Sequence, residues 1–388
     1  MAASNPPYNS LTAIMKVHMK TSLSELTEFY STNYSKSKQW CKLSYLIFLF
    51  VTTHMATVDL FAIGNALIDQ EFKVSDDFLS QQGLQKGTMQ LSDGDTQSAL
   101  YAELKQHQDY KGQASGGSAA NTTVAFSALG GSAFYGCRVG HDDLGEIYLQ
   151  GLNEANIQTT PKSISKGVTG TCMVLISPDS ERTMHTYLGI TAELSQDQID
   201  FEPLKTAKWL YIEGYLSTSE TARKAVKQAR EIAKANGVKI ALSLSDPAMV
   251  QYAREGLEEL MDDGVDLLFC NEQEALMYTN TTSVEDALTQ LRFKNHTVVI
   301  TQSAKGALVS NPTQHFHVAG RHVEAVDTNG AGDAFAGAFL YALNYHQDLN
   351  AAAQLAILIS SEVVSQFGPR LAVNDYAKLL ENFQKECA

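Results

Sequence analysis

The feature that most constrains the fold is a strict alternation of short apolar runs with helix-like runs in the middle of the chain. Strand-like runs are expected at 208–214, 238–244, 265–270 and 297–301. A helix is expected at Ser219–Asn236, which Gly237 ends, and others follow Asp246-Pro247 and begin at Asn271. Strands that alternate with helices form a mostly parallel sheet covered on both faces. The alternation therefore predicts an α/β three-layer sandwich, with ligands bound beyond the carboxyl ends of its strands.

Two parts of the chain do not fit a plain sandwich. The first core strand, in the run 58–69, ends in polar residues, and 170–189 alternates around the polar tip 177–182. The second pattern predicts a β-hairpin. Strands that leave the main sheet in this way would form a small β lid over the site. We expect lid segments at about 66–95 and 160–190, and a last helix at roughly Leu349–Ser365.

Charge and cysteine content exclude several classes of protein. The 388 residues carry a formal net charge of -14, whereas a nucleic-acid-binding protein needs a basic face. The same acidity argues against a polybasic membrane anchor. Five cysteines occur, none in CxxC spacing, which is typical of reduced thiols rather than of zinc sites or disulfides. We therefore expect a cytoplasmic protein with a small-molecule ligand and with no nucleic-acid or membrane partner.

The start of the chain differs in character from the remainder. The apolar run Leu43–Val51 is too short to span a bilayer as a helix, and no small-residue cleavage site follows it. Met55 directly precedes the first strand-like run. We interpret 1–54 as an N-terminal extension, either disordered or produced by a misplaced start codon, and an N-terminal anchor is the competing interpretation. Residues 55–388 are expected to form one domain.

The run Val326–Leu340, VDTNGAGDAFAGAFL, places glycines and two aspartates directly before a helix-forming stretch. Gly330, Ala331 and Gly332 lack bulky side chains, so their backbone N–H groups can converge on an anion at the helix N-terminus. Asp333 would lie beside a phosphate bound there, where a carboxylate suits the task of accepting a proton. The alternative is a glycine-rich turn that caps a helix, with Asp333 complementing the helix dipole.

Several stretches, in the same order, resemble the PfkB, or ribokinase-like, family of carbohydrate and nucleoside kinases. Its C-terminal signature is similar to Val326–Leu340, its N-terminal signature to 116–121 and 136–146, and its N-x-x-E motif to Asn271–Glu274. The resemblance covers about 55–371. It implies that 55–388 is a kinase domain of the ribokinase-like fold that uses ATP and Mg²⁺.

The resemblance also implies roles for the matching residues. Asp333 resembles the catalytic base, and the glycine-rich backbone before it resembles the anion hole. Asn271 and Glu274 resemble the pair that organises Mg²⁺ mainly through water, and their i, i+3 spacing puts both on one helix face. Arg182 resembles a lid arginine that moves toward the transferring phosphate; a solvated turn arginine is the alternative. Asp327 is a candidate support for the metal or for a monovalent cation such as K⁺.

Polar residues just after the first strand point to the acceptor. Asn65 and Asp69 lie in the run GNALID, and one carboxylate can accept hydrogen bonds from both hydroxyls of a ribose diol. Gly116 and Gly117 would let a sugar approach the backbone, and Asn121 could reach another hydroxyl. For Asp69, a turn carboxylate at a strand end is the alternative.

Within the family, the runs 64–69 with 76–84, 134–146 and 169–184 are most similar to the members that phosphorylate adenosine. This similarity implies transfer to the primary 5′-hydroxyl of a ribonucleoside, with adenosine converted to AMP. Tyr215 and Phe134 are candidates for a nucleobase slot, or else belong to the core. The alternatives are a kinase for a free sugar, inosine or guanosine, and, from another class, a catalytically silent ligand-binding protein.

For ATP, the run Thr301–Ala307 resembles the family loop near the nucleotide ribose and phosphates. Thr301, Ser303 and Gly306 are its candidate contacts, and a plain β-turn is the alternative. Asn329 of the C-terminal signature is expected to contact ATP as well. The oligomeric state stays open between monomer and homodimer.

Overall fold

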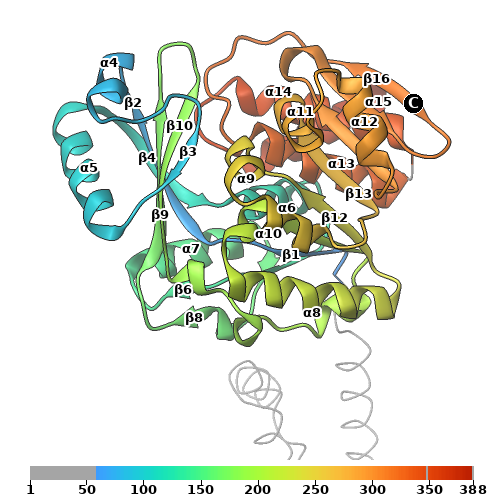
Figure 1. Ribbon diagram of the computed structural model, residues 1–388, viewed down its shortest axis with the longest axis horizontal. Coiled ribbons are helices and arrows are strands. Elements are labelled where there is room, and N and C mark those ends of the chain that lie inside the picture. Colours follow the sequence, from blue (N-terminus) through green and yellow to red (C-terminus); the bar gives the residue numbers. More distant parts are fainter. Residues whose placement is uncertain (1–57, 347, 387–388) are drawn as a thin grey trace, which may run out of the picture. The chain divides into compact units, whose positions relative to one another are not determined.

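The computed structural model describes residues 58–346 and 348–386. These residues contain a nine-stranded sheet (Figure 1). Its order is β16-β15-β14-β13-β12-β11-β1-β5-β7. The strands are β1 Leu60–Ile63, β5 Ala133–Gly136, β7 Ile157–Gln158, β11 Trp209–Glu213, β12 Lys239–Ser243, β13 Leu267–Asn271, β14 Thr297–Thr301, β15 Gly306–Ser310 and β16 His315–Ala319. Neighbours from β14 to β7 are parallel, and β15 and β16 are antiparallel additions. The prediction of a mostly parallel sheet is confirmed.

Helices cover both faces of this sheet. Apart from α4 Asp76–Gln81 and α5 Gly94–His107, which pack elsewhere, the described helices are α6 Ser118–Ala128, α7 Asp143–Glu154, α8 Glu220–Asn236, α9 Pro247–Tyr252, α10 Arg254–Met261, α11 Glu272–Thr279, α12 Val284–Arg292, α13 Ala331–His346, α14 Leu349–Val364 and α15 Val373–Glu386. Side chains alternate along each strand, so Leu60 of β1 joins the core with α6, α13 and α14, whereas Phe61 joins the core with α8 to α12. The three-layer sandwich is therefore confirmed.

The helix boundaries follow from local capping. Ser219 accepts a hydrogen bond from the Ala222 N–H at 3.3 Å and so starts α8, which ends at Gly237 in the left-handed conformation at φ 72°. Asp246 caps α9 by accepting from the Ala248 N–H at 2.7 Å, with Pro247 in the first turn. These caps lie where the sequence predicts them.

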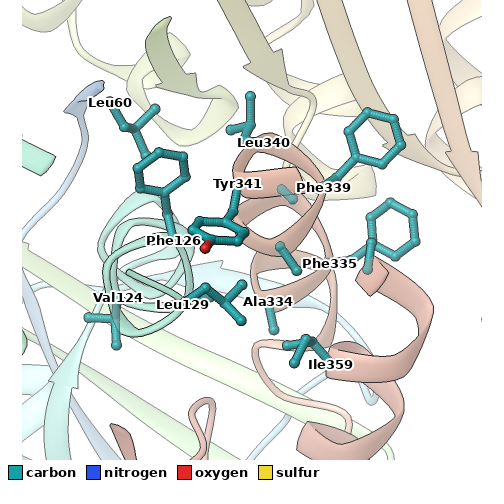
Figure 2. Close-up of a cluster of buried hydrophobic side chains, with 14 of the residues drawn as sticks. Leu60, Val124, Phe126, Leu129, Ala334, Phe335, Phe339, Leu340, Tyr341 and Ile359 are labelled. Atoms are coloured by element: carbon teal, nitrogen blue, oxygen red, sulfur yellow. The ribbon is translucent and has the colours of Figure 1, made fainter. Parts of the chain in front are cut away.

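The core between α6 and α13 is packed closely enough to bring the two helices into contact. Figure 2 shows Phe126 of α6 beside Tyr341 of α13, and their ring centroids are 6.0 Å apart in an edge arrangement. At Gly337 of α13 an added Cβ would overlap the carbonyl oxygen of Thr122 on α6. Because Gly337 has no side chain, α6 and α13 can pack this closely.

A second sheet has five strands in the order β3-β10-β9-β2-β4. Its strands are β2 Leu67–Lys73, β3 Met89–Leu91, β4 Asp109–Gly116, β9 Thr169–Ile176 and β10 Arg182–Gly189, with β9 and β10 forming the expected hairpin. One face packs on α4 and α5 through a small core that includes Phe72, Leu100 and Met173. Figure 1 shows α5 on the side of this sheet away from the helices of the large sheet. A small β structure beside the main sheet was expected, but the contributions of β4 and α5 were not.

The C-terminal part also differs from expectation. The predicted last helix corresponds to α14, Leu349–Val364, but a further amphipathic helix, α15, follows it and packs Tyr376, Leu380 and Phe383 into the core. Within 58–346 and 348–386, no helix is long and apolar enough to cross a membrane. The described cysteines Cys137, Cys172 and Cys270 are buried and free.

Candidate active site

A cavity of about 1260 Å³ lies between the carboxyl ends of the large sheet's strands and one face of the small sheet. Asp69 of β2 and Cys172 of β9 are paired neighbours in the small sheet, and both line it. The predicted site residues that line the cavity are Asn65, Asp69, Gly117, Asn121, Arg182, Tyr215, Asn271, Glu274, Thr301, Ser303, Gly306, Asn329, Gly330, Ala331, Gly332 and Asp333. Residues far apart in sequence therefore share one cavity.

The glycine-rich loop forms a helix N-terminus that opens into this cavity. Gly330 adopts φ 72°, and a Cβ there would overlap the carbonyl oxygen of Pro369. Its own carbonyl accepts the Ala334 N–H at 2.8 Å, so the N–H groups of the preceding residues of α13 have no partner within the helix, although that of Ala331 donates to the Thr328 carbonyl at 3.4 Å. A Cβ at Gly332 would meet no protein atom within 4 Å. The loop thus offers backbone N–H groups and free space together, as an anion requires.

Asp327 holds this loop from behind. Its Oδ1 accepts the Asn329 N–H at 2.8 Å and its Oδ2 accepts the Gly368 N–H at 3.0 Å, and the side chain is fully buried. Both carboxylate oxygens of Asp327 therefore tie the loop to the segment that follows α14.

Asp333, in the first turn of α13, is held by two residues of α6. Its Oδ1 accepts from the Ser118 hydroxyl at 2.6 Å, and its Oδ2 accepts from the Asn121 Nδ2 at 2.9 Å. Burial raises the pKa of Asp333, while these hydrogen bonds and Arg182 act in the opposite direction. A carboxylate held in one orientation with a raised pKa suits proton transfer.

Asn121 is engaged with protein on both ends of its amide. Its Nδ2 donates to Asp333, and its Oδ1 accepts from the Nε of Arg370 at 2.7 Å. The structure therefore places Asn121 as a support of Asp333. It also lines the cavity and has a second N–H on Nδ2, so its contact with a ligand hydroxyl stays a prediction. Arg370 and Ser118 were not predicted, because no local pattern links them to a residue on α13.

Asp69 is buried at the wall of the cavity formed by the small sheet. Burial raises its pKa to about 7, Arg370 lowers it and Asp333 raises it. Gly116 does not line the cavity; a Cβ at Gly116 would overlap the Asp69 carboxylate, so this glycine makes room for the aspartate. Asn329, predicted as an ATP contact, also lines the cavity, and its buried Nδ2 has no hydrogen-bond partner among the described residues.

A buried glutamate, Glu213, organises the same end of the cavity. It ends β11 and accepts from the Asn65 N–H at 2.7 Å, from the Asn65 Nδ2 at 2.8 Å and from the Ala119 N–H at 2.7 Å. Burial raises its pKa to about 7, and the backbone hydrogen bonds lower it. Glu213 thus joins Asn65 to the first turn of α6, which carries Ser118 and Asn121. Glu213 was not predicted, although its position at the carboxyl end of a strand was a signal in the sequence.

Arg182 crosses from the small sheet to the loop before α13. Its Nη1 donates to the Thr328 carbonyl at 2.7 Å, and Thr328 Oγ1 donates to the Ser180 carbonyl at 3.3 Å. Ser180 in turn donates to the Ala325 carbonyl at 3.0 Å. The tip of the β9–β10 hairpin is therefore attached to the loop that precedes Gly330, with the guanidinium beside the anion site.

Asn271 and Glu274 form a capping box at the start of α11. The Asn271 Oδ1 accepts the Glu274 N–H at 2.8 Å, and Glu274 accepts the Asn271 N–H at 2.9 Å and its Nδ2 at 2.6 Å. Burial raises the pKa of Glu274 to about 8. In 58–346 and 348–386, no group of three or more His, Cys, Asp or Glu side chains could hold a metal ion. Mg²⁺ usually keeps several water ligands and binds few protein side chains. The side-chain oxygens of Asn271 and Glu274 at the cavity, completed by phosphate and water, fit this mode of binding.

The other end of the cavity is bounded by the turn after β14. Gln302 is tied to α11 through its Nε2, which donates to the Glu272 carboxylate at 2.9 Å. Gly306 has φ 110°, and a Cβ there would overlap the Val318 carbonyl oxygen. Ile357 and Ser360 of α14 also line the cavity. The walls at this end combine a tight turn with an apolar helix face, which fits a nucleotide.

The two aromatic candidates are placed differently. Phe134 lies in the core, stacked on Phe61 with ring centroids 5.0 Å apart, and does not line the cavity. Tyr215 lines the cavity, with its hydroxyl 3.5 Å from the Asp246 carboxylate. The apolar wall of the cavity is instead built by aliphatic and thioether side chains of the small sheet, which run from β2 beside Asp69 to β10 and the edge strand β3, among them Leu67, Met89, Leu91, Met184 and Leu188.

Comparisons with known proteins agree with this arrangement. Residues 88–375 match the pfkB family carbohydrate kinases. The chain is 27% identical over 333 residues to an adenosine kinase of Saccharomyces cerevisiae, covering 81% of this chain and 96% of that protein. It is 29% identical over 274 residues to a ribokinase of Haemophilus influenzae, covering 69% and 86% respectively. The crystal structure of adenosine kinase from Sinorhizobium meliloti has 33% identity and a TM-score of 0.79, covering 86% of this chain and 100% of that one.

The family match spans most of the chain, and the fold is that of its solved relatives. Relatives named adenosine kinase and ribokinase share this similarity. It therefore identifies the type of reaction but not the acceptor. We conclude that the chain belongs to the pfkB family of carbohydrate kinases and is a phosphotransferase with an alcohol group as acceptor.

Proposed function

We propose that this kinase phosphorylates the primary 5′-hydroxyl of a ribonucleoside, with adenosine as the acceptor and AMP as the product. The observation that carries the proposal is the apolar wall beside Asp69. Leu67, Met184 and Leu188 of the small sheet continue the cavity past the polar residues that would bind a sugar. A nucleobase needs such an apolar surface, and a free sugar does not. Relatives named adenosine kinase support the same choice.

In this proposal Asp69 accepts hydrogen bonds from the ribose 2′- and 3′-hydroxyls. The buried Asn65–Glu213 pair, whose Nδ2···Oε1 distance is 2.8 Å, forms the polar floor next to it. Because a buried carboxylate left without its diol is penalised, the site would strongly discriminate against deoxy acceptors.

Asp333 takes the proton from the 5′-hydroxyl, and the alkoxide oxygen attacks the γ-phosphorus of ATP as the bond to the ADP oxygen breaks. The backbone N–H groups at the start of α13 and the guanidinium of Arg182 stabilise charge on the transferring group. Mg²⁺, when bound near Asn271 and Glu274, would neutralise charge on the phosphates. Thr301, Ser303 and Gly306 line the same cavity and would contact the nucleotide.

A second candidate acceptor is a free sugar. The polar cluster of Asn65, Asp69 and Glu213 could hold a ribose without a base, and the Haemophilus influenzae ribokinase is a relative. The test is a phosphorylation assay with ATP and Mg²⁺ on adenosine, inosine, guanosine, ribose and fructose. We expect the highest kcat/KM with adenosine. Faster turnover of ribose or fructose would refute the nucleoside assignment, and thermal stabilisation by adenosine without turnover of any acceptor would indicate a binding protein.

The base is tested separately by Asp333→Asn. We expect this variant to lose turnover while it retains ATP binding, measured by titration calorimetry. Near-native kcat in the variant would show that Asp333 is not the base.

A further inference from the structure

An arginine outside the recognised motifs contacts the residue that holds Asp333. Arg370 lies in the segment between α14 and α15, and its Nε donates to Asn121 Oδ1 at 2.7 Å. Its Nη1 donates to the Ser115 hydroxyl of β4 at 2.9 Å. Its Nη2 is buried, with no hydrogen-bond partner in the described residues. A buried guanidinium with one donor unpaired is costly, which is a reason to seek a role beyond packing.

The contact determines how the Asn121 amide is oriented. Arginine only donates hydrogen bonds, so the Asn121 oxygen must face Arg370. Its NH₂ group must then face Asp333, to which Nδ2 donates at 2.9 Å. With the amide reversed, donor would meet donor at Arg370, and an oxygen would meet a carboxylate at Asp333. Arg370 and the Asp333 carboxylate therefore impose the same orientation on the Asn121 amide from its two ends.

The neighbours of Arg370 reach the same functional elements. The Gly368 N–H donates to Asp327 at 3.0 Å, and Pro369 packs against Gly330 so closely that a Cβ at Gly330 would lie 2.6 Å from the Pro369 Cα. Three consecutive residues thus brace the anion-binding loop and the support of Asp333 together. No spacing in the sequence links this segment to α6 or α13.

We propose that Arg370 is a positioning residue for the phosphoryl transfer, which acts through the relay Arg370–Asn121–Asp333 to hold the base carboxylate in one orientation. This proposal rests on the assignment of Asp333 as the base. The residue does not need to touch either substrate. It fixes the amide that fixes the carboxylate, and its positive charge partly offsets the carboxylates gathered around it.

The charged groups around Asp333 determine how its pKa would change if Arg370 were replaced. Arg182 and Arg370 lower the pKa of Asp333, and burial raises it. The other titratable groups that sense Asp333 are Asp69, Tyr211, Glu213, Tyr215, Glu274 and Tyr376. Removing one of two cations among these carboxylates raises the pKa of Asp333, so activity would need a higher pH.

The test compares Arg370→Met, Arg370→Lys and the surface control Arg254→Met in the full-length protein. Arg254 is exposed on α10 and pairs with Glu258 at 3.1 Å. We expect Arg370→Met to lower kcat about 100-fold, to leave the KM for ATP within a factor of about three, and to shift the acid limb of kcat, measured at saturating adenosine, to higher pH. Arg370→Lys should keep the limb near its native position, because the charge remains, with a kcat between those of the native and Met forms. Arg254→Met should behave as native.

A purely structural role would give a different result. If Arg370→Met unfolds at a lower temperature but keeps native kcat and pH profile when folded, the proposal is wrong. If Arg370→Met does not fold, Arg370→Ala assayed with added guanidinium replaces it. Recovery of kcat by guanidinium, and not by ammonium, supports the relay, and equal activity with both refutes it.

The failure of this inference is distinguishable from failure of the base assignment. An inactive Asp333→Asn together with native behaviour of Arg370→Met refutes only the relay. An active Asp333→Asn refutes the base assignment itself, whatever the Arg370 variants do.

Discussion

Replacing Gly337 by alanine is expected to slow catalysis without removing any polar group. Gly337 lies one turn after Asp333 on α13 and faces α6. A Cβ there would lie 2.8 Å from the Cβ of Ala125 and would overlap the Thr122 carbonyl oxygen. Carbon atoms in contact are normally about 3.5–4.0 Å apart. The two helices would therefore have to separate by about 1 Å, because neither neighbour is the end of a flexible side chain.

That separation acts directly on the base. The Asp333 carboxylate is bonded to Ser118 at 2.6 Å and to Asn121 at 2.9 Å, both on α6. A further 1 Å or so takes these distances to or beyond the limit for useful hydrogen bonds. A displacement of this size at a catalytic group costs about 100-fold in rate. Overpacking between the helices should also destabilise the fold by about 1–3 kcal/mol.

The assay is the rate of ADP release at saturating ATP and adenosine, together with thermal unfolding. Gly94→Ala is the matched control, because a Cβ at this helical glycine meets its nearest atom, on Tyr187, at an ordinary 3.4 Å. We expect native kcat for Gly94→Ala and about a 100-fold loss for Gly337→Ala. If Gly337→Ala keeps native kcat and unfolding temperature, the helix contact does not position Asp333.

Three further predictions concern single groups in the cavity. Affinity for adenosine should rise as pH increases through about 7, because Asp69 must ionise to accept both hydroxyls; Asp69→Asn should abolish this dependence of KM on pH and raise KM. Gly332→Ala should leave the unfolding temperature unchanged, since no protein atom lies within 4 Å, but should lower kcat by about 100-fold as the methyl occupies the anion site; an unchanged kcat would place the phosphate elsewhere. Glu274→Gln should raise the Mg²⁺ concentration for half-maximal rate by about 10- to 100-fold, and an unchanged Mg²⁺ titration would remove Glu274 from the metal site.

Much of the fold could be predicted because its signals are local. The apolar strands from β11 to β14 and the caps Ser219, Gly237 and Asp246 lie where the sequence indicated. The strand β4, Asp109–Gly116, was missed because it is polar and largely exposed, so its side chains carry no apolar alternation. Its place in the small sheet depends on pairing with β2, which no local pattern records.

The candidate site was predictable to the same degree. Asp333, Asn271 and Glu274 belong to contiguous motifs, and the structure places them at one cavity. For Phe134 the sequence left open a nucleobase slot or the core, because an aromatic residue on a strand can face either side. Its ring stacks on Phe61 in the core. Arg370 carries no motif at all; its role depends on contact with Asn121.

Short stretches of sequence were enough to indicate a parallel sheet, the sheet edge at which the cavity lies and a glycine-rich helix start with room for an anion. These follow from strand periodicity and backbone freedom, which are properties of short stretches. The partners of each polar side chain, in contrast, become visible only in the folded chain. Ser118 and Asp333 are 215 positions apart, and Asn121 and Arg370 are 249 apart, yet each pair is hydrogen-bonded. Buried polar groups must find partners wherever the packed chain supplies them, and that choice is made in three dimensions.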